Sequence, residues 1–293
     1  MQAEGSPATG DYCPIALLSI IGKAMERIVH AKLSSFLGPW LNINQSGFRK
    51  RDGTVPQLIR LCQQWSEAVD SSHYVGVMFF DLKKFVDRVW HRGLLVKLRA
   101  AGIHESAYAW FCSFLADRQQ ATLVDGCLST FSRVLAGVPQ VAVLSPLLFS
   151  IYMNDIPSSS PPFGSTASPN TNLFADDTSL YVIDKSFTSL ASRLQRDVDI
   201  VSSWFERWLL TVNASKSATM VLHSRGMSAQ LLKIVAGSSV LCQVKSQRHL
   251  GVIFSETLTW SDHVDHVLSK ASSKLGFLRR LRRRLSCLII PNL

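Results

Sequence analysis

The chain has 293 residues, and a hydrophobic content of 47% lets it bury a substantial core, which excludes a disordered polymer. Its formal net charge of +10 favours a polyanionic partner such as nucleic acid, although a merely basic globular protein has the same composition. No apolar run is long enough to span a bilayer, no signal peptide is visible, and the 6 cysteines form no Cys-x-x-Cys pair, so we expect an intracellular protein with reduced thiols and no membrane partner.

The first half of the chain predicts helices around one buried strand. Apolar residues recur at helical spacing over 15–37, 54–69, 91–101, 105–115 and 145–155. We expect Ser145 to be the N-cap of the last of these helices. The apolar run Tyr74–Phe80 predicts a buried strand, and residues 120–125 and 130–135 predict a hairpin around Asp125-Gly126.

The second half of the chain predicts short strands and one long helix. Residues 157–172 are rich in Pro, Ser and Asn, so we expect a flexible loop there. It is followed by a hairpin around Asp176-Asp177, by an amphipathic helix over 190–209 and by short strands near 220–222, 231–235 and 240–244. This order lacks strict βαβ repetition and therefore predicts an α+β fold.

Two adjacent aspartates, Asp176 and Asp177, stand between two apolar runs. Like charges side by side repel, and the tip of a hairpin would ordinarily be Asn-Gly or Asp-Gly, so a bound cation best accounts for this pair. A third carboxylate, Asp81, follows the buried strand Tyr74–Phe80. Three acidic groups at one sheet edge are the minimal ligand set for two-metal phosphoryl transfer.

The chain beyond residue 253 is predicted to be helical and is strongly basic. Its cations include Lys270, Lys274, Arg279, Arg280, Arg282, Arg283 and Arg284. A charge run of this kind is usually a solvated helix face. Its place after the sheet also suits a lobe that grips a nucleic-acid backbone, and we weigh the two interpretations equally.

Short sequence blocks occur in a fixed order from Tyr12 to about Leu285. They are Tyr12-Cys13-Pro14-Ile15, Gln45-Ser46-Gly47-Phe48-Arg49, Asp81-Leu82-Lys83-Lys84, Asp87-Arg88-Val89-Trp90-His91, Gly137-Val138-Pro139-Gln140, Leu144-Ser145-Pro146-Leu147-Leu148-Phe149, Phe174-Ala175-Asp176-Asp177, Leu250-Gly251-Val252 and Leu258-Thr259-Trp260. As an ordered set they resemble the reverse transcriptase domain of non-LTR (LINE-type) retrotransposons.

The resemblance implies a right-hand polymerase fold. Its fingers would cover 1–72, its palm with inserted finger elements 73–255, and the start of a truncated, basic, helical thumb 256–293. The implied activity is RNA-directed DNA polymerisation on an RNA template, with a DNA primer, dNTPs and two Mg²⁺ ions, or Mn²⁺ in their place. The residues by themselves argue only for two-metal chemistry on nucleic acid, and no protein partner can be inferred.

The same resemblance implies roles for individual residues. Asp81, Asp176 and Asp177 match the metal-binding carboxylates, and hard oxygen ligands are what Mg²⁺ requires. Lys216 matches a lysine that protonates or neutralises the leaving pyrophosphate, and Arg49 matches a cation in the fingers that faces the incoming triphosphate. Gln140 would touch the nucleotide or the adjacent template. Without the resemblance, Arg49 and Lys216 would be interpreted as solvated surface cations.

Two positions depart from the family pattern, both in the expected nucleotide pocket. Val141 stands where the family has glycine after Pro-Gln, and a backbone that lies against a ligand favours glycine. The family has Ala-Phe where this chain has Phe85-Val86, so Val86 replaces the aromatic residue expected under the sugar. We therefore expect weak polymerase activity.

A second hypothesis follows from these departures: the chain is a catalytically impaired, nucleic-acid-binding remnant of such an element. The expected absence of an endonuclease, a zinc knuckle and a complete thumb also favours it. The intact set of three aspartates favours an active polymerase.

Overall fold

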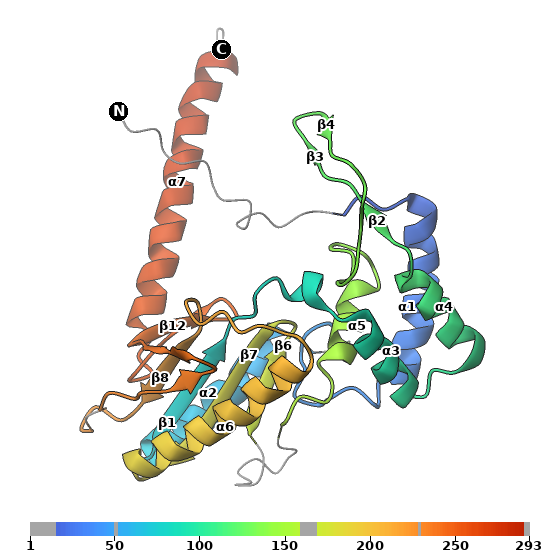
Figure 1. The fold of residues 1–293 in the computed structure, drawn as a ribbon. Helices are drawn as coiled ribbons and strands as arrows, with labels where there is room; N and C mark the ends of the chain where they lie inside the picture. The colour runs from blue at the N-terminus through green and yellow to red at the C-terminus, as the bar shows by residue number, and fades with distance from the viewer. Residues whose placement is uncertain (1–15, 50–51, 159–168, 228–229, 290–293) are drawn as a thin grey trace.

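The computed structural model of the chain describes residues 16–49, 52–158, 169–227 and 230–289, with side chains described to residue 281. Its centre is a five-stranded sheet in the order β11-β8-β1-β7-β6 (Figure 1). The strands are β1 (Tyr74–Phe80), β6 (Asn170–Phe174), β7 (Asp177–Asp184), β8 (Ala218–Leu222) and β11 (Cys242–Gln243). Strand β1 pairs antiparallel with β7 and β8, and β11 pairs parallel with β8.

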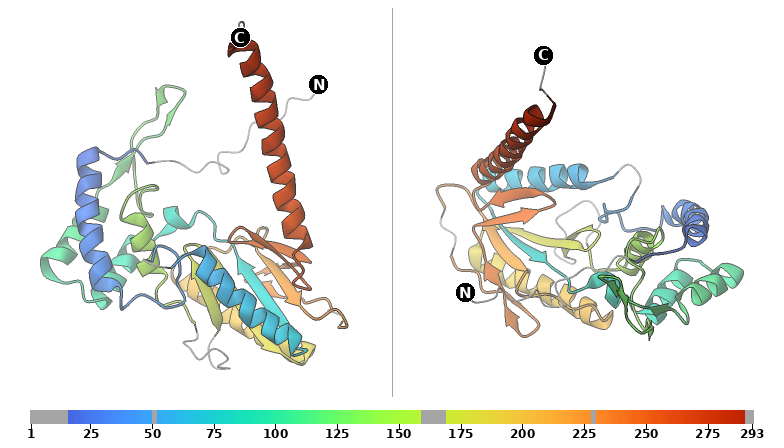
Figure 2. Two further views of the ribbon diagram at one scale, coloured as in Figure 1. Left: turned by 180° about the vertical axis from the view of Figure 1, so that it is seen from behind. Right: turned by 90° about the horizontal axis from the view of Figure 1, so that it is seen from above.

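The central strand β1 is covered on both faces, which is why its sequence is a continuous apolar run. On one face Met78 and Phe80 pack in a core with α6 (Phe187–Arg207), and on the other Val77 and Phe79 pack in a core with α2 (Thr54–Asp70). Figure 2 shows the sheet between these two helices. The sheet is thus a rigid layer that fixes the positions of the residues at the ends of its strands.

A group of helices stands beside the sheet and forms a second lobe (Figures 1 and 2). It contains α1 (Ile20–Leu37), α3 (His91–Ala100), α4 (Glu105–Leu115) and α5 (Ser145–Tyr152). The hairpin predicted around Asp125-Gly126 is confirmed and extends from this lobe. Its strands are β2 (Gln119–Gln120), β3 (Leu123–Val124), β4 (Cys127–Leu128) and β5 (Ser132–Arg133), with β2 paired to β5 and β3 to β4.

The C-terminal elements leave the sheet on the side of α2. Strands β12 (Ser246–His249) and β13 (Val252–Ser255) pair with each other, and α7 (Ser261–Ile289) projects away from them (Figure 1). The short β9 (Val235–Ala236) and β10 (Ser239–Val240) form a separate hairpin. In the part of the chain that the structure describes, no helix is both long enough and apolar enough to cross a membrane.

Several sequence predictions need correction. Ser145 is not an N-cap: Leu144 is, and the Ser145 hydroxyl donates 2.7 Å to the Pro139 carbonyl inside the lobe. The predicted loop 157–172 ends earlier, because 170–172 pair with β7 as part of β6; its residues 159–168 lie outside the described part. Of the predicted strand 231–235 only Val235 is strand, as the first residue of β9, and the first helix begins at Ile20, not at residue 15.

The cysteines whose side chains are described carry free thiols, as the sequence predicts. They are Cys62, Cys112, Cys127 and Cys242. Cys13 and the Cys287 side chain lie outside the described part.

Candidate active site

The register of the sheet brings Asp81 and Asp177 together. Phe80 pairs with Thr178, so one further step along both strands places Asp81 opposite Asp177. Directly opposed residues of an antiparallel pair point to the same face. Asp81 and Asp177, two of the three carboxylates predicted to meet at one sheet edge, therefore lie side by side on the face that carries α2 and β12.

Asp176 lies in the tight turn between β6 and β7. Its neighbour Ala175 has a positive φ of 57°, and the Ala175 amide donates 3.1 Å to the Gln45 side chain. Gly47 packs so closely against this turn that a Cβ added to it would lie 2.4 Å from the Ala175 nitrogen. The Gln45-Ser46-Gly47 segment thus holds the turn that carries Asp176.

The pKa values of Asp176 and Asp177 are both raised. The pKa of Asp176 is raised to about 6. Burial is the largest cause, and the nearby charges of Asp177 and Asp81 contribute to the same rise. Burial also raises the pKa of Asp177, with the charge of Asp81 as the second cause, even though the Asp177 side chain still reaches solvent. Protonation or a cation would relieve this repulsion.

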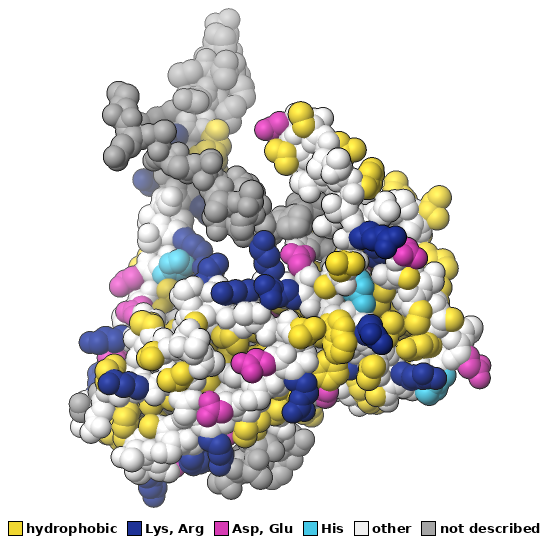
Figure 3. Space-filling model, viewed as in Figure 1, with side chains coloured by type: hydrophobic (Ala, Val, Ile, Leu, Met, Phe, Trp, Pro, Cys, Tyr) yellow, Lys and Arg dark blue, Asp and Glu magenta, His cyan; other side chains and the backbone are white. Residues whose placement is uncertain are grey.

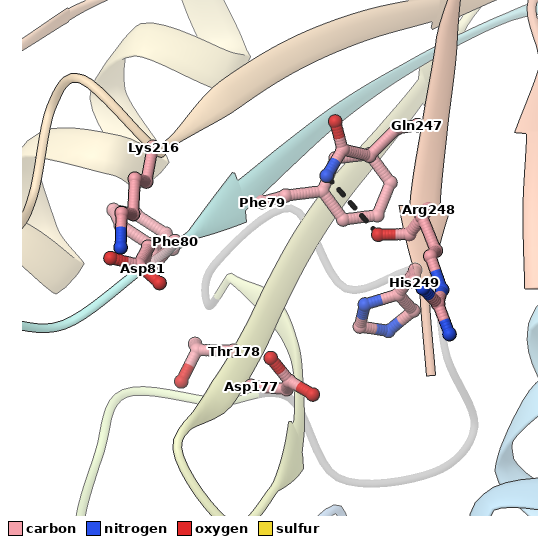
Figure 4. A pocket seen from close by; sticks show the side chains of 9 residues that line it. All are labelled: Phe79, Phe80, Asp81, Asp177, Thr178, Lys216, Gln247, Arg248 and His249. Atoms are coloured by element: carbon pink, nitrogen blue, oxygen red, sulfur yellow. Dashed lines mark hydrogen bonds between the residues drawn. The ribbon is translucent and has the colours of Figure 1, made fainter. Parts of the chain in front are cut away.

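The segment that precedes β8 fixes Asp81. The Asn213 side chain donates 2.8 Å to the Asp81 carboxylate, and the Ser217 hydroxyl accepts from the Asp81 amide at 3.0 Å. Lys216 lies between these two partners, and its side chain points toward Asp81 (Figure 4). The predicted lysine and the predicted metal ligand therefore share one local structure.

A pocket of about 190 Å³ opens over these residues (Figure 4). Its chemistry-bearing lining residues are Asp81, Asp177, Lys216, Gln247, Arg248 and His249. The last three come from β12 and were missed by sequence reasoning; the only sequence signal is their place directly before Leu250-Gly251-Val252. The His249 ring is buried, lies 5.2 Å from the Phe79 ring and has its pKa lowered to about 4 by burial, so it is neutral at pH 7.

The donor chemistry of the pocket suits a hard divalent cation, because carboxylate oxygens are its only anionic groups. Among the described residues, however, no three Asp, Glu, His or Cys side chains come close enough together to hold a metal ion by themselves. Mg²⁺ ordinarily uses one or two protein carboxylates together with substrate phosphates and water. Asp81 and Asp177 fit that arrangement.

The loop that contains Gln140 and Val141 lies beside the short 3₁₀ helix Phe85–Arg88. Gln140 donates 3.0 Å to the Asp87 carboxylate, and the Val138 amide donates 2.9 Å to the Val86 carbonyl. Val141 is exposed and has a φ of 67°, a left-handed conformation that a β-branched residue rarely adopts. None of Gln140, Val141 and Val86 lines the pocket over Asp81.

Other predicted site residues stand apart from the pocket. The Arg49 guanidinium donates 3.0 Å to the Asn42 carbonyl, a contact within its own segment. The ring of Phe85, the residue before Val86, packs 4.8 Å from the Phe149 ring. Lys270, Lys274, Arg279 and Arg280 are exposed along α7, whereas the side chains of Arg282, Arg283 and Arg284 lie outside the described part.

Comparison with solved structures shows the fold class of the chain. An apo telomerase structure from Candida tropicalis, truncated from the C-terminal domain, superposes with a TM-score of 0.51 at 14% identity, covering 82% of this chain and 45% of that one. The chain therefore has the right-hand polymerase fold, in agreement with the predicted α+β class.

Sequence comparison then identifies the family. The family model for reverse transcriptase (RNA-dependent DNA polymerase) matches residues 4–254. The RNA-directed DNA polymerase from mobile element jockey of Drosophila melanogaster is 31% identical over 286 residues, which is 96% of this chain and 30% of that protein. The probable RNA-directed DNA polymerase from transposon BS of the same species is 30% identical, over 99% of this chain and 32% of that protein.

The chain belongs to the reverse transcriptase family, in the group of non-LTR retrotransposon domains that its sequence resembles. It spans about a third of the length of these curated relatives.

Proposed function

We propose that this chain is an RNA-directed DNA polymerase domain that adds dNTPs to a primer 3′ end on an RNA template. The observation that carries the proposal is the meeting of Asp81, Asp177 and Lys216 at one pocket at the edge of the sheet. Family membership supports the choice of reaction, and the telomerase fold supports a nucleic-acid substrate.

In this proposal Asp81 and Asp177, with Asp176 on the adjoining turn, hold two divalent ions, Mg²⁺ or Mn²⁺. When bound, the ions supply charge neutralisation at the triphosphate and lower the pKa of the primer 3′ hydroxyl. Asn213 and Ser217 keep the Asp81 carboxylate and backbone in place. Lys216 stands beside the carboxylates, where it can neutralise the departing pyrophosphate.

Arg49 and Gln140 lie outside the pocket, and each is hydrogen-bonded to another residue. One guanidinium nitrogen of Arg49 is bonded to the Asn42 carbonyl, and we propose that an incoming triphosphate draws the guanidinium toward the site. Gln140 is held by Asp87, and we propose that it supports the nucleotide or template from that position. We further propose fingers over 1–72, a palm over 73–255 and a basic thumb from 256, with the cations of α7 on the duplex backbone.

The second candidate, a catalytically impaired remnant that binds nucleic acid, has one specific observation in its favour. Val141 holds a backbone conformation suited to glycine, in the loop where the family pattern has glycine. This strain predicts a slow enzyme and leaves the many exposed cations intact, so nucleic-acid binding would outlast catalysis.

A primer-extension assay on matched RNA and DNA templates with Mg²⁺ distinguishes the two candidates. The proposal predicts extension on the RNA template by the wild type and by the control Asp265→Asn, which changes an exposed aspartate of α7. It predicts a loss of at least about a hundredfold for Asp177→Asn. Equal extension by the wild type and Asp177→Asn, or binding without any extension, contradicts polymerase function.

A further inference from the structure

A second and larger hollow lies on the α6 side of the sheet and shares no lining residue with the active-site pocket. Its volume is about 590 Å³, within the range of sites that bind small organic ligands. Its walls are the end of α6, the 209–214 segment, the turn between β9 and β10, and the residues that follow β1. We call it the rear groove.

The polar groups of the rear groove are of three kinds. Lys83 and Arg88 supply two exposed cations, and one Arg88 nitrogen already donates 2.8 Å to the Thr211 hydroxyl, which orients the guanidinium. Ser238 in the β9–β10 turn and Ser239 at the start of β10 add hydroxyls. Glu206 of α6 supplies one anion.

Ser202 belongs to the wall of the rear groove. Its side chain is buried in the wall of the groove, with 8% of its surface exposed, and in the described part of the chain its hydroxyl has no hydrogen-bond partner. Because this oxygen has less than 1 Å² of accessible surface, a ligand in the groove does not reach it, and the contacts to a ligand come from the other lining residues.

These groups together restrict the chemistry of the ligand. Lys83 and Arg88 select a phosphate, and the planar fork of an arginine binds phosphate oxygens in pairs. Glu206 would repel a simple anion and needs a hydrogen-bond donor opposite it. Leu209, exposed at 56%, and Val212 offer apolar surface. A nucleotide unit combines a phosphate, donor groups and an apolar ring face.

We propose that the rear groove binds a nucleotide unit, with its phosphate on Lys83 and Arg88 and its sugar or base toward Glu206 and the β9–β10 turn. The unit comes either from a free nucleotide or from a nucleic-acid strand that passes behind the sheet. This site is separate from the proposed polymerase site, so it does not depend on catalysis.

The test is photo-crosslinking in EDTA, which suppresses metal-dependent binding at the active site. The probes are 8-azido-ATP and a ten-nucleotide RNA containing 4-thiouridine, each with the full chain, followed by mass spectrometry of the labelled peptides. We expect label within 209–214 or 236–239. Label from the azido-ATP indicates a free nucleotide, and label from the RNA alone indicates a strand.

Matched variants make the test specific. Lys83→Gln with Arg88→Gln should lower this labelling at least about tenfold, the effect of losing one charge-assisted hydrogen bond. The control Lys185→Gln with Arg92→Gln removes the same charge from exposed residues outside both pockets and should not change it. Ser238→Trp, on an exposed turn, should block the groove without disturbing the core.

Three outcomes would overturn the proposal. They are label that maps only to other segments, equal labelling of the wild type and both groove variants, and competition by inorganic phosphate as effective as competition by ATP. The last result would show a site for simple anions.

Discussion

Val141 combines a β-branched side chain with a φ of 67°, so its backbone is strained. Val141→Gly should relieve this strain and stabilise the chain by about 1 kcal/mol, after the entropy cost of glycine is deducted. It should also raise single-nucleotide incorporation. Thermal unfolding and incorporation are compared with those of Val141→Ala, which keeps a Cβ at the same φ. Equal behaviour of the two variants would show that the backbone strain has no consequence.

Asp176 should make the metal-free protein less stable as pH rises. Its pKa is raised from 3.8 to about 6 in the folded chain, mainly by burial, so the folded state binds the proton more tightly than the unfolded state. This stabilisation is complete below pH 3.8 and is lost as pH rises through about 6. In EDTA, Asp176→Asn should therefore unfold at a higher temperature than the wild type at pH 7.5 and lose that advantage at pH 4.

The control for this prediction is Asp265→Asn, which removes an exposed carboxylate of α7. It should shift the unfolding temperature equally at both pH values. A wild type that is as stable as Asp176→Asn at pH 7.5 would contradict the account of the acidic cluster.

The sequence predicts the site residues that lie at the ends of strands. It does not predict the residues that tertiary packing brings to the pocket from other elements. Asp81 and the Asp176-Asp177 pair are flanked by apolar runs, so their position at a sheet edge follows from the pattern alone. His249 and Arg248 reach the same pocket only because the β12–β13 hairpin folds over β1, and no periodicity encodes that contact. Arg49 is the opposite case. Its motif predicts a place in the site, but its guanidinium donates to the Asn42 carbonyl and does not line the pocket.

At the scale of elements, the Gln45–Gly47 segment should be essential for the turn that carries Asp176. Gly47→Ala would place a Cβ 2.4 Å from the Ala175 nitrogen, and a backbone atom cannot yield as a flexible side chain can. We expect a loss of about 1–3 kcal/mol of stability and a larger loss of nucleotide incorporation. The control is Gly226→Ala, at an exposed turn where an added Cβ meets no atom within 4 Å. Equal effects of the two substitutions would refute this role.

Lys97 ties three helices together. Its ammonium is buried, bonds the Tyr152 carbonyl and Asp155, and lies 3.5 Å from the centre of the Trp208 ring beyond α6. Burial lowers the pKa of Lys97 from 10.5 to about 8, with Asp155 opposing the shift. The unfolded chain therefore binds more protons between these values, and stability rises with pH there.

Lys97→Met should remove this pH dependence. Between pH 7.5 and 10 the wild type should gain up to about 3 kcal/mol in unfolding free energy relative to Lys97→Met, measured by urea titration. Lys185→Met changes an exposed lysine and should follow the wild type. A constant difference between the wild type and Lys97→Met across this range would show that Lys97 stays charged in the folded state throughout.

The elements themselves were largely predictable, because most are long and periodic. The helices over 54–70, 105–115 and 187–207 and the strand β1 agree with their apolar patterns within a few residues. The start of β6 was not predictable, since Asn170 and Thr171 have loop composition and become strand only through pairing with β7. At these two residues the hydrogen bonds to β7 outweigh the low strand propensity of the local sequence.

On the scale of the whole molecule, the charge distribution agrees with the proposal that cations bind the nucleic-acid backbone and carboxylates bind the metal ions. Lys and Arg side chains gather at the bottom of the hollow between α7 and the helical lobe (Figure 3), while Asp81 and Asp177 lie at the sheet edge. Sequence could predict the net charge of +10 and the polymerase fold, but not this arrangement. It depends on how α7 leaves the β12–β13 hairpin.

The central claim is that Asp81 and Asp177 act as one metal-binding unit. Electron paramagnetic resonance of Mn²⁺, titrated into the full chain with a dNTP present, measures this directly. We predict that Asp81→Asn and Asp177→Asn each weaken Mn²⁺ binding at least about tenfold, since loss of an outer-sphere partner alone costs 10–100-fold, and that Asp265→Asn binds like the wild type. Unchanged Mn²⁺ affinity in both active-site variants would contradict the claim.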